Sequence, residues 1–154
     1  MTWQGRHRRG PVLRAVVDAA NRRLDGALPT DVPGVREVFE DDFALVAALQ
    51  LRWHTRLSGA IEQALHTGYA DPETAVVTAW RSTAGALPGV RAVLDARIER
   101  PGSEAERTAL RTATRKDRAL LAAMAGLAAP SDPRAVALGQ RLEERARGGL
   151  HLAA

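Results

Sequence analysis

Residues 49–68, LQLRWHTRLSGAIEQALHTG, place a tryptophan and a histidine next to each other, with an arginine on either side. On a helical wheel with about 100° per residue, Trp53 lies near the centre of an apolar face. That face is formed by Phe39, Val46, Trp53, Leu57, Ala60 and Ala64. Arg52 and Arg56 fall on one flank, where their stems can cover the core while their charges stay in water, and His54 falls on the other. The pattern predicts an amphipathic helix anchored by a buried Trp53 rather than the edge of an active site.

The remainder of the chain also has helical patterns, and no segment shows the sustained alternation of polar and β-branched residues typical of strands. Capping residues, prolines and glycines divide it into helical segments. The expected segments are 11–25, 35–67 with an interruption near Asp41–Asp42, 72–99 with a break or kink at Pro88–Gly89, 103–128 and 133–147. These segments, joined by short links, predict an all-α fold, a single bundle of five or six helices.

We expect one domain, because 154 residues is an ordinary domain length. Residues 1–10 are predicted to be a basic N-terminal arm, 11–147 the helical bundle and 148–154 a flexible C-terminal tail released by Gly148–Gly149. The final Leu152-Ala153-Ala154 resembles the ending of the tag that bacteria add to stalled chains, which a ClpX-type unfoldase reads. This resemblance implies a degradation signal, whereas chance in an alanine-rich chain would leave a plain disordered end.

Composition limits the location of the protein and the chemistry open to it. The chain has no cysteine, which excludes disulfides and thiolate metal sites. Arg14 and Asp18 interrupt the first apolar stretch, so no signal peptide is expected. The longest uncharged stretch, residues 119–131, is too short to span a bilayer. We therefore expect a cytoplasmic protein without membrane contact, and its preference for arginine over lysine is typical of a GC-rich bacterial genome.

Positive charge gathers in two parts of the sequence. Arg107, Arg111, Arg115 and Arg118 follow one another at helical spacing and form a stripe on the outer face of residues 103–128. Arg6, Arg8 and Arg9 lie in the N-terminal arm. Both sets are candidate partner-binding residues for nucleic acid or an acidic protein. In the alternative interpretation the stripe is a solvated face partly neutralised by Glu104, and the arm is neutralised by the acidic residues 31–42.

The candidates for catalysis and metal binding are few. His54 is interpreted as a structural or solvated histidine, and His66 faces away from it. Asp42 falls among apolar positions, where a carboxyl group can have a raised pKa. The alternative is that it caps a helix or pairs with an arginine of the N-terminal arm. No phosphate-binding loop, nucleophile elbow or metal-binding pair of histidines is present. We therefore expect no catalytic residue, no cofactor and no metal.

Two further segments allow an interaction role. Residues 78–97 have the order of a helix-turn-helix, with Arg91, Asp95 and Arg97 as its few base-reading side chains. Residues 119–129 are apolar on both faces, which predicts a central helix or the seam of a homo-oligomer.

The sequence favours a non-enzymatic interaction or regulatory protein that binds nucleic acid or an acidic macromolecule through its arginine-rich faces. One alternative is a small-molecule-binding or enzymatic bundle with a cleft near Asp42 and His54. A second alternative is a structural homo-oligomeric protein.

Overall fold

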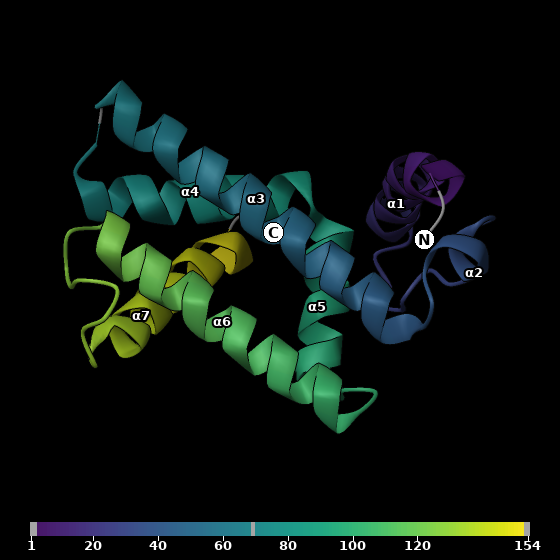
Figure 1. Cartoon of the computed structure of the whole chain (residues 1–154). Coiled ribbons are helices and arrows are strands. Elements are labelled where there is room, and N and C mark those ends of the chain that lie inside the picture. Colours follow the sequence, from purple (N-terminus) through teal and green to yellow (C-terminus); the bar gives the residue numbers. More distant parts are fainter. Residues whose placement is uncertain (1–2, 69, 153–154) are drawn as a thin grey trace. The chain divides into compact units, whose positions relative to one another are not determined.

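The computed structural model describes residues 3–68 and 70–152, with the side chains of residues 8–68 and 70–148. Every regular element in these ranges is an α-helix, which confirms the predicted all-α class (Figure 1). The described helices are α1 (Trp3–Arg23), α2 (Val35–Val38), α3 (Asp42–Thr67), α4 (Pro72–Ala86), α5 (Pro88–Glu99), α6 (Glu104–Met124) and α7 (Ala135–Leu152). They number seven rather than five or six, because the short α2 stands apart from α3 and Leu87 separates α4 from α5.

Local capping explains where several helices begin and end. The Ala44 N–H donates to Asp41 Oδ1 over 2.8 Å at the start of α3, so the expected interruption near Asp41–Asp42 is confirmed. Asp71 accepts the Thr74 N–H over 3.0 Å at the start of α4. Ser103 Oγ accepts the Glu106 N–H over 3.1 Å at the start of α6. In each case a short polar side chain satisfies a backbone donor that the helix itself leaves without a partner.

Three helix boundaries differ from the expected ones. α1 begins at Trp3 and continues through Pro11, although proline has no N–H for the helix. α7 continues through Gly148–Gly149 to Leu152. α6 ends at Met124 rather than near residue 128, because Gly126 has a positive φ of 74° and the Leu127 N–H bonds back to the Ala122 carbonyl over 2.9 Å.

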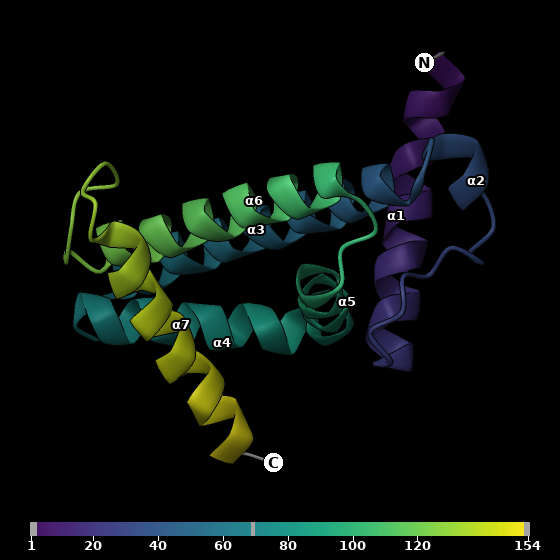
Figure 2. The same ribbon diagram turned by 90° about the horizontal axis from the view of Figure 1, so that it is seen from below.

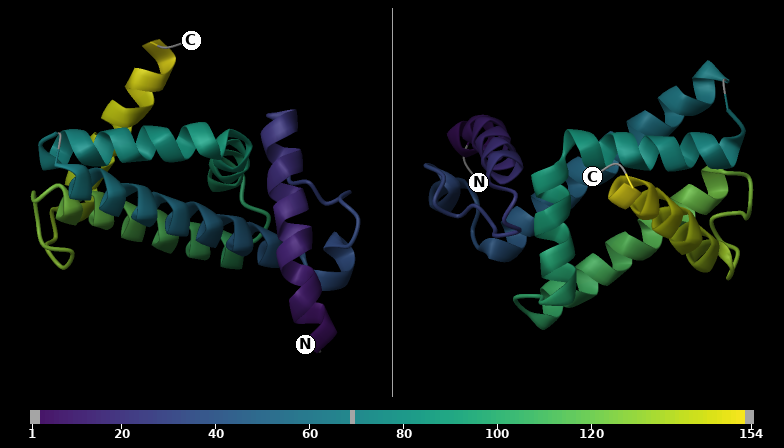
Figure 3. Two further views of the ribbon diagram at one scale, coloured as in Figure 1. Left: turned by 90° about the horizontal axis from the view of Figure 1, so that it is seen from above. Right: turned by 180° about the vertical axis from the view of Figure 1, so that it is seen from behind.

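The contacts within the chain group into two compact units. The first comprises residues 1–53 and 87–110 and contains α1, α2, α5 and the first parts of α3 and α6. α1 packs against α5 in this unit (Figure 3). The contact is close enough that a Cβ at Gly89 would overlap the backbone of Ala20 and Asn21. Trp53 is buried in this unit with 1% of its surface exposed, which confirms the predicted anchor.

The second unit comprises residues 54–86 and 111–154 and contains α4, α7 and the second parts of α3 and α6. α4 packs against α7, and α3 and α6 lie side by side (Figure 2). The apolar residues that fill this unit include Leu57, Ile61, Trp80, Leu121, Leu142 and Ala146. The finer expectation of a single bundle over residues 11–147 remains a prediction.

Gly139 of α7 offers a stability test with an internal control. A Cβ at this position would overlap the Arg118 carbonyl of α6, whereas a Cβ at Gly148 of the same helix meets nothing within 4 Å. Gly139→Ala should destabilise the protein by about 1–3 kcal/mol through overpacking. Gly148→Ala should instead stabilise it by about 0.5–1 kcal/mol, since alanine favours helix. Urea denaturation measures both values, and equal effects at the two glycines would contradict the close approach of α6 and α7.

Candidate functional site

A row of cations lies on the exposed side of α6 within the second unit. Arg111, Thr112, Arg115 and Lys116 are all exposed, and we call these four residues the α6 basic face. Arg111 and Arg115 are one turn apart, which places them about 6 Å from each other along the helix axis. Among the residues that the structure describes, neither arginine nor Lys116 has a carboxylate partner. The face therefore presents hydrogen-bond donors and positive charge to solvent.

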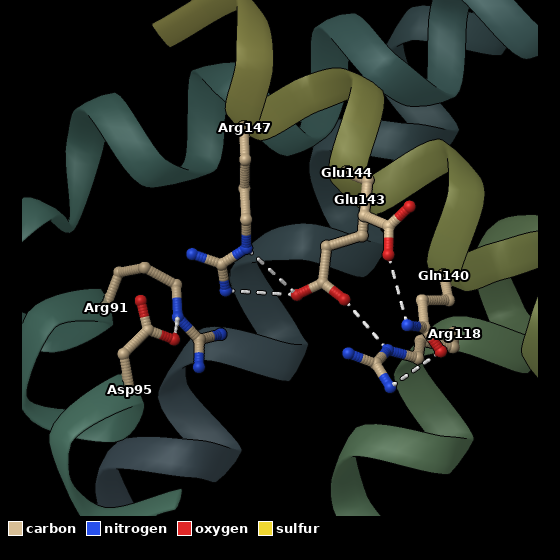
Figure 4. A network of polar contacts seen from close by, with 7 residues as sticks. All are labelled: Arg91, Asp95, Arg118, Gln140, Glu143, Glu144 and Arg147. Atoms are coloured by element: carbon tan, nitrogen blue, oxygen red, sulfur yellow. Dashed lines mark hydrogen bonds and ion pairs between the residues drawn. The ribbon is translucent and has the colours of Figure 1, made fainter. Parts of the chain in front are cut away.

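The other two arginines of the predicted stripe form ion pairs within the chain. Arg107 Nε lies 3.2 Å from Glu104 Oε1. Arg118 Nε donates to Glu143 Oε2 over 2.8 Å, and Glu143 also accepts from Arg147 Nη2 over 3.0 Å (Figure 4). The Glu143 side chain is only 11% exposed, so it holds α6 and α7 together from a largely buried position. The sequence suggested as an alternative that Glu104 partly neutralises the stripe, and this neutralisation is present for Arg107.

The N-terminal arginines have contacts with the residues around α2. Arg8 Nη2 lies 2.7 Å from Glu37 Oε2, and the Arg9 guanidinium lies 4.9 Å from the centroid of the Phe39 ring. These contacts join the part of α1 that precedes Pro11 to the residues around α2. The neutralisation expected between the basic residues and segment 31–42 is therefore present for Arg8. The Arg6 side chain lies outside the described residues, as does the structure of Ala153 and Ala154.

The base-reading side chains expected of a helix-turn-helix are engaged inside the first unit. Arg91 is 8% exposed and donates to Asp95 Oδ1 over 3.0 Å (Figure 4). Its guanidinium also lies over the Trp53 ring, 4.5 Å from the centroid. Arg97 binds Glu106 through Nε and Nη2 over 3.1 and 2.8 Å. Since these side chains stabilise the fold, α5 has little left with which to read bases.

A second constellation lies where α3 and α6 meet in the second unit. His54 Nδ1 lies 2.7 Å from Asp117 Oδ1, and Ser58 Oγ lies 3.5 Å from His54 Nε2. His54 was a candidate from the sequence, but neither of its partners was. The spacing of His54 and Ser58 by four residues was a usable signal, because such residues share a helix face. Asp117 is 63 positions away, and no local pattern connects it to His54.

Asp42 does not join this constellation. It is the first residue of α3, its side chain is 44% exposed, and its Oδ1 accepts a hydrogen bond from Arg36 Nη1 over 3.0 Å. The expected pairing with an arginine is therefore present, although its partner lies in α2 rather than in the N-terminal arm. Helix capping at this point falls to Asp41 instead.

The part of the chain that the structure describes contains no cluster of three or more histidine, cysteine, aspartate or glutamate side chains placed to hold a metal ion. Within the same residues, no helix has both the length and the apolar character required to cross a bilayer. Comparisons with protein-family models, with curated proteins and with solved structures gave no match.

Proposed function

We propose that the protein binds nucleic acid through the α6 basic face, by contacts to the phosphate backbone. The observation that supports this proposal is the set of three exposed cations on consecutive turns of one helix without a carboxylate partner among the described residues. Arginine, lysine and threonine side chains are all common donors to phosphate oxygens. The proposal also locates the protein in the cytoplasm, where nucleic acid is accessible.

The positions of the other arginines support the choice of this face. Arg8, Arg97 and Arg118 are paired with carboxylates of the chain, so their charge is largely compensated. An ion pair already formed must be broken before the arginine can bind a phosphate, which reduces the gain in binding free energy. Arg111, Arg115 and Lys116 carry no such cost within the described structure.

The structural alternative, a homo-oligomer joined through residues 119–129, has less support. Leu121, Ala122 and Ala125 of this segment are buried, and its other apolar side chains are half-buried except that of Ala129, which is exposed. The large apolar side chains described as exposed are Leu24, Leu51 and Ile98, which lie elsewhere. Burial within one chain accounts for the apolar character of the segment.

The proposal predicts a salt-dependent affinity that the α6 basic face controls. Three phosphate contacts give a slope of about −2.7 in log K against log salt, or about 40-fold weaker binding to duplex DNA at 200 mM than at 50 mM salt. Changing Arg111, Arg115 and Lys116 to glutamine should remove the part of the salt dependence that comes from these three phosphate contacts. Fluorescence anisotropy with labelled duplex DNA and duplex RNA measures both quantities.

The control removes the same charge from other exposed sites, with Arg56, Arg100 and Arg141 changed to glutamine. This control should keep most of the affinity if the face, rather than net charge, is responsible. Equal losses in the two triple variants would overturn the proposal. It is also overturned if the wild type binds neither duplex at about 50 mM salt, and binding to polyglutamate alone would then identify an acidic protein as the partner.

A further inference from the structure

Ser58, His54 and Asp117 form a chain of hydrogen-bonding groups that the proposed binding function does not use. The distances are 3.5 Å from Ser58 Oγ to His54 Nε2 and 2.7 Å from His54 Nδ1 to Asp117 Oδ1. We propose that Ser58 is a nucleophile that hydrolyses small activated carboxylic esters, with His54 as its general base and Asp117 as a positioning residue. A nucleophile next to a base that a third group orients is the arrangement that activates serine hydroxyls.

The hydrogen-bond partners set the protonation state that this chemistry requires. A carboxylate only accepts hydrogen bonds, so Asp117 places the proton of neutral His54 on Nδ1. Nε2 then has a free lone pair and accepts the hydrogen bond that the Ser58 hydroxyl donates. The same lone pair is the one that removes the Ser58 proton during attack.

The side chains of the three residues differ in exposure in a way that suits their proposed roles. The Asp117 side chain is 13% exposed, which shields its interaction with His54 from solvent. The His54 side chain is 43% exposed, so a small substrate can approach it from solution. The spacing of four residues along α3 keeps Ser58 and His54 on one face of the helix. The distance of 3.5 Å is long for a hydrogen bond, and such contacts are often loose before substrate binds.

The reaction balances with water as the only co-reactant. Ser58 Oγ forms a bond to the ester carbonyl carbon while its proton moves to His54 Nε2, and the bond to the leaving alcohol breaks as the alcohol takes up that proton. Water then attacks the acyl-serine, giving its proton to His54 Nε2. The acid departs and the proton returns to Ser58 Oγ. The products are the carboxylic acid and the alcohol.

The position of Ser58 within α3 limits the substrate class. Backbone N–H groups in the middle of a helix are already bonded to carbonyls four residues earlier, so they do not stabilise an oxyanion. Solvent must therefore stabilise the negative charge at this half-exposed site. General base catalysis alone contributes about 10²- to 10⁴-fold in rate. Such an enhancement suits esters whose leaving group departs readily, rather than amides.

The test uses p-nitrophenyl acetate and the full chain. The wild type should release p-nitrophenolate and carry an acetyl group on Ser58, located by peptide mass spectrometry after an acid quench. Ser58→Ala and His54→Ala should lower the protein-dependent rate by about 10²- to 10⁴-fold. Ser82→Ala removes an exposed serine from α4 and should leave the rate unchanged. Acetylation only at another residue, or an unchanged rate in Ser58→Ala, would overturn the proposal.

Asp117→Asn tests positioning separately from folding. An asparagine amide can donate to His54 Nδ1 as well as accept from it, so the variant no longer fixes the His54 proton on Nδ1. Asp117→Asn should therefore lower the rate of p-nitrophenolate release and of Ser58 acetylation, and Asp117→Glu, which keeps the carboxylate, should restore part of that rate. Urea denaturation shows whether both variants keep the fold, and two folded variants with the rate of the wild type would contradict the role of Asp117.

Discussion

Replacement of Trp53 by alanine is expected to destabilise the protein by about 3–5 kcal/mol, because it removes a large buried side chain and leaves a cavity. The indole ring is 1% exposed and is among the largest fully buried side chains of the described structure. The variant also removes the ring that the Arg91 guanidinium covers at 4.5 Å, so a largely buried cation loses a favourable contact. Urea denaturation followed by far-UV circular dichroism measures the change in the free energy of unfolding.

Leu51 provides the matched control in the same helix. Its side chain is 65% exposed and points away from the core that holds Trp53. Leu51→Ala should change the free energy of unfolding by less than about 0.5 kcal/mol. A loss below about 1 kcal/mol for Trp53→Ala would contradict the burial of the ring, and the stretch around it would again be a candidate binding site.

Local rules predicted most helix boundaries, and two of the others lie next to contacts between residues far apart in the sequence. Asp41 and Asp71 cap helices through N–H groups three residues away, so the sequence alone contains the whole interaction. Pro11 and Gly148 looked like boundaries by the same local reasoning, yet both lie within helices. The Arg8–Glu37 ion pair lies in the extra turns at the N-terminus, and near the C-terminus Arg147 contacts Glu143 and the ring of Trp80, the latter at 4.8 Å.

The distribution of free and paired arginines could not be predicted from spacing. Helical periodicity placed Arg107, Arg111, Arg115 and Arg118 in one stripe along residues 103–128. Which of them remain free depends on where carboxylates lie in the fold, and Glu143 is 25 positions from Arg118. The same limit applies to His54, whose interpretation from the sequence did not include a contact with Asp117. A single sequence gives the residues on a helix face, whereas the tertiary packing decides their partners.

Replacement of Arg97 by methionine is the second change expected to have a large effect. Glu106 is 1% exposed and accepts hydrogen bonds from Arg97 Nη2 over 2.8 Å and from the Gly102 N–H over 2.6 Å. Without Arg97 the carboxylate stays buried with its charge uncompensated, which typically costs about 3–5 kcal/mol. Changing Glu106 to leucine as well should recover most of that loss, because a buried ion pair can be replaced by apolar residues of similar volume.

The destabilisation caused by Arg97→Met should also depend on pH, and the direction of that dependence identifies its cause. Burial raises the pKa of Glu106, but the hydrogen bonds from Arg97 and Gly102 and the charge of Arg97 lower it further, so it lies below the ordinary value of 4.5. In the wild type the ionised Glu106 therefore stabilises the fold above about pH 4.5, and this contribution to the free energy of unfolding is lost as pH falls through the pKa of the folded state.

In Arg97→Met the burial that raises the pKa of Glu106 is no longer opposed by the guanidinium. The folded variant then takes up a proton more readily than the unfolded chain, so its stability falls as pH rises through the raised pKa. The difference in the free energy of unfolding from wild type should be largest near pH 7 and should shrink as pH falls toward about 4, because other carboxylates titrate alike in both proteins.

The control is Arg107→Met, which breaks the exposed pair with Glu104 and should change the free energy of unfolding by at most about 1 kcal/mol. Denaturation curves across this pH range compare the variants, and a difference that stays constant with pH would show that Arg97 stabilises the fold through packing rather than by neutralising Glu106.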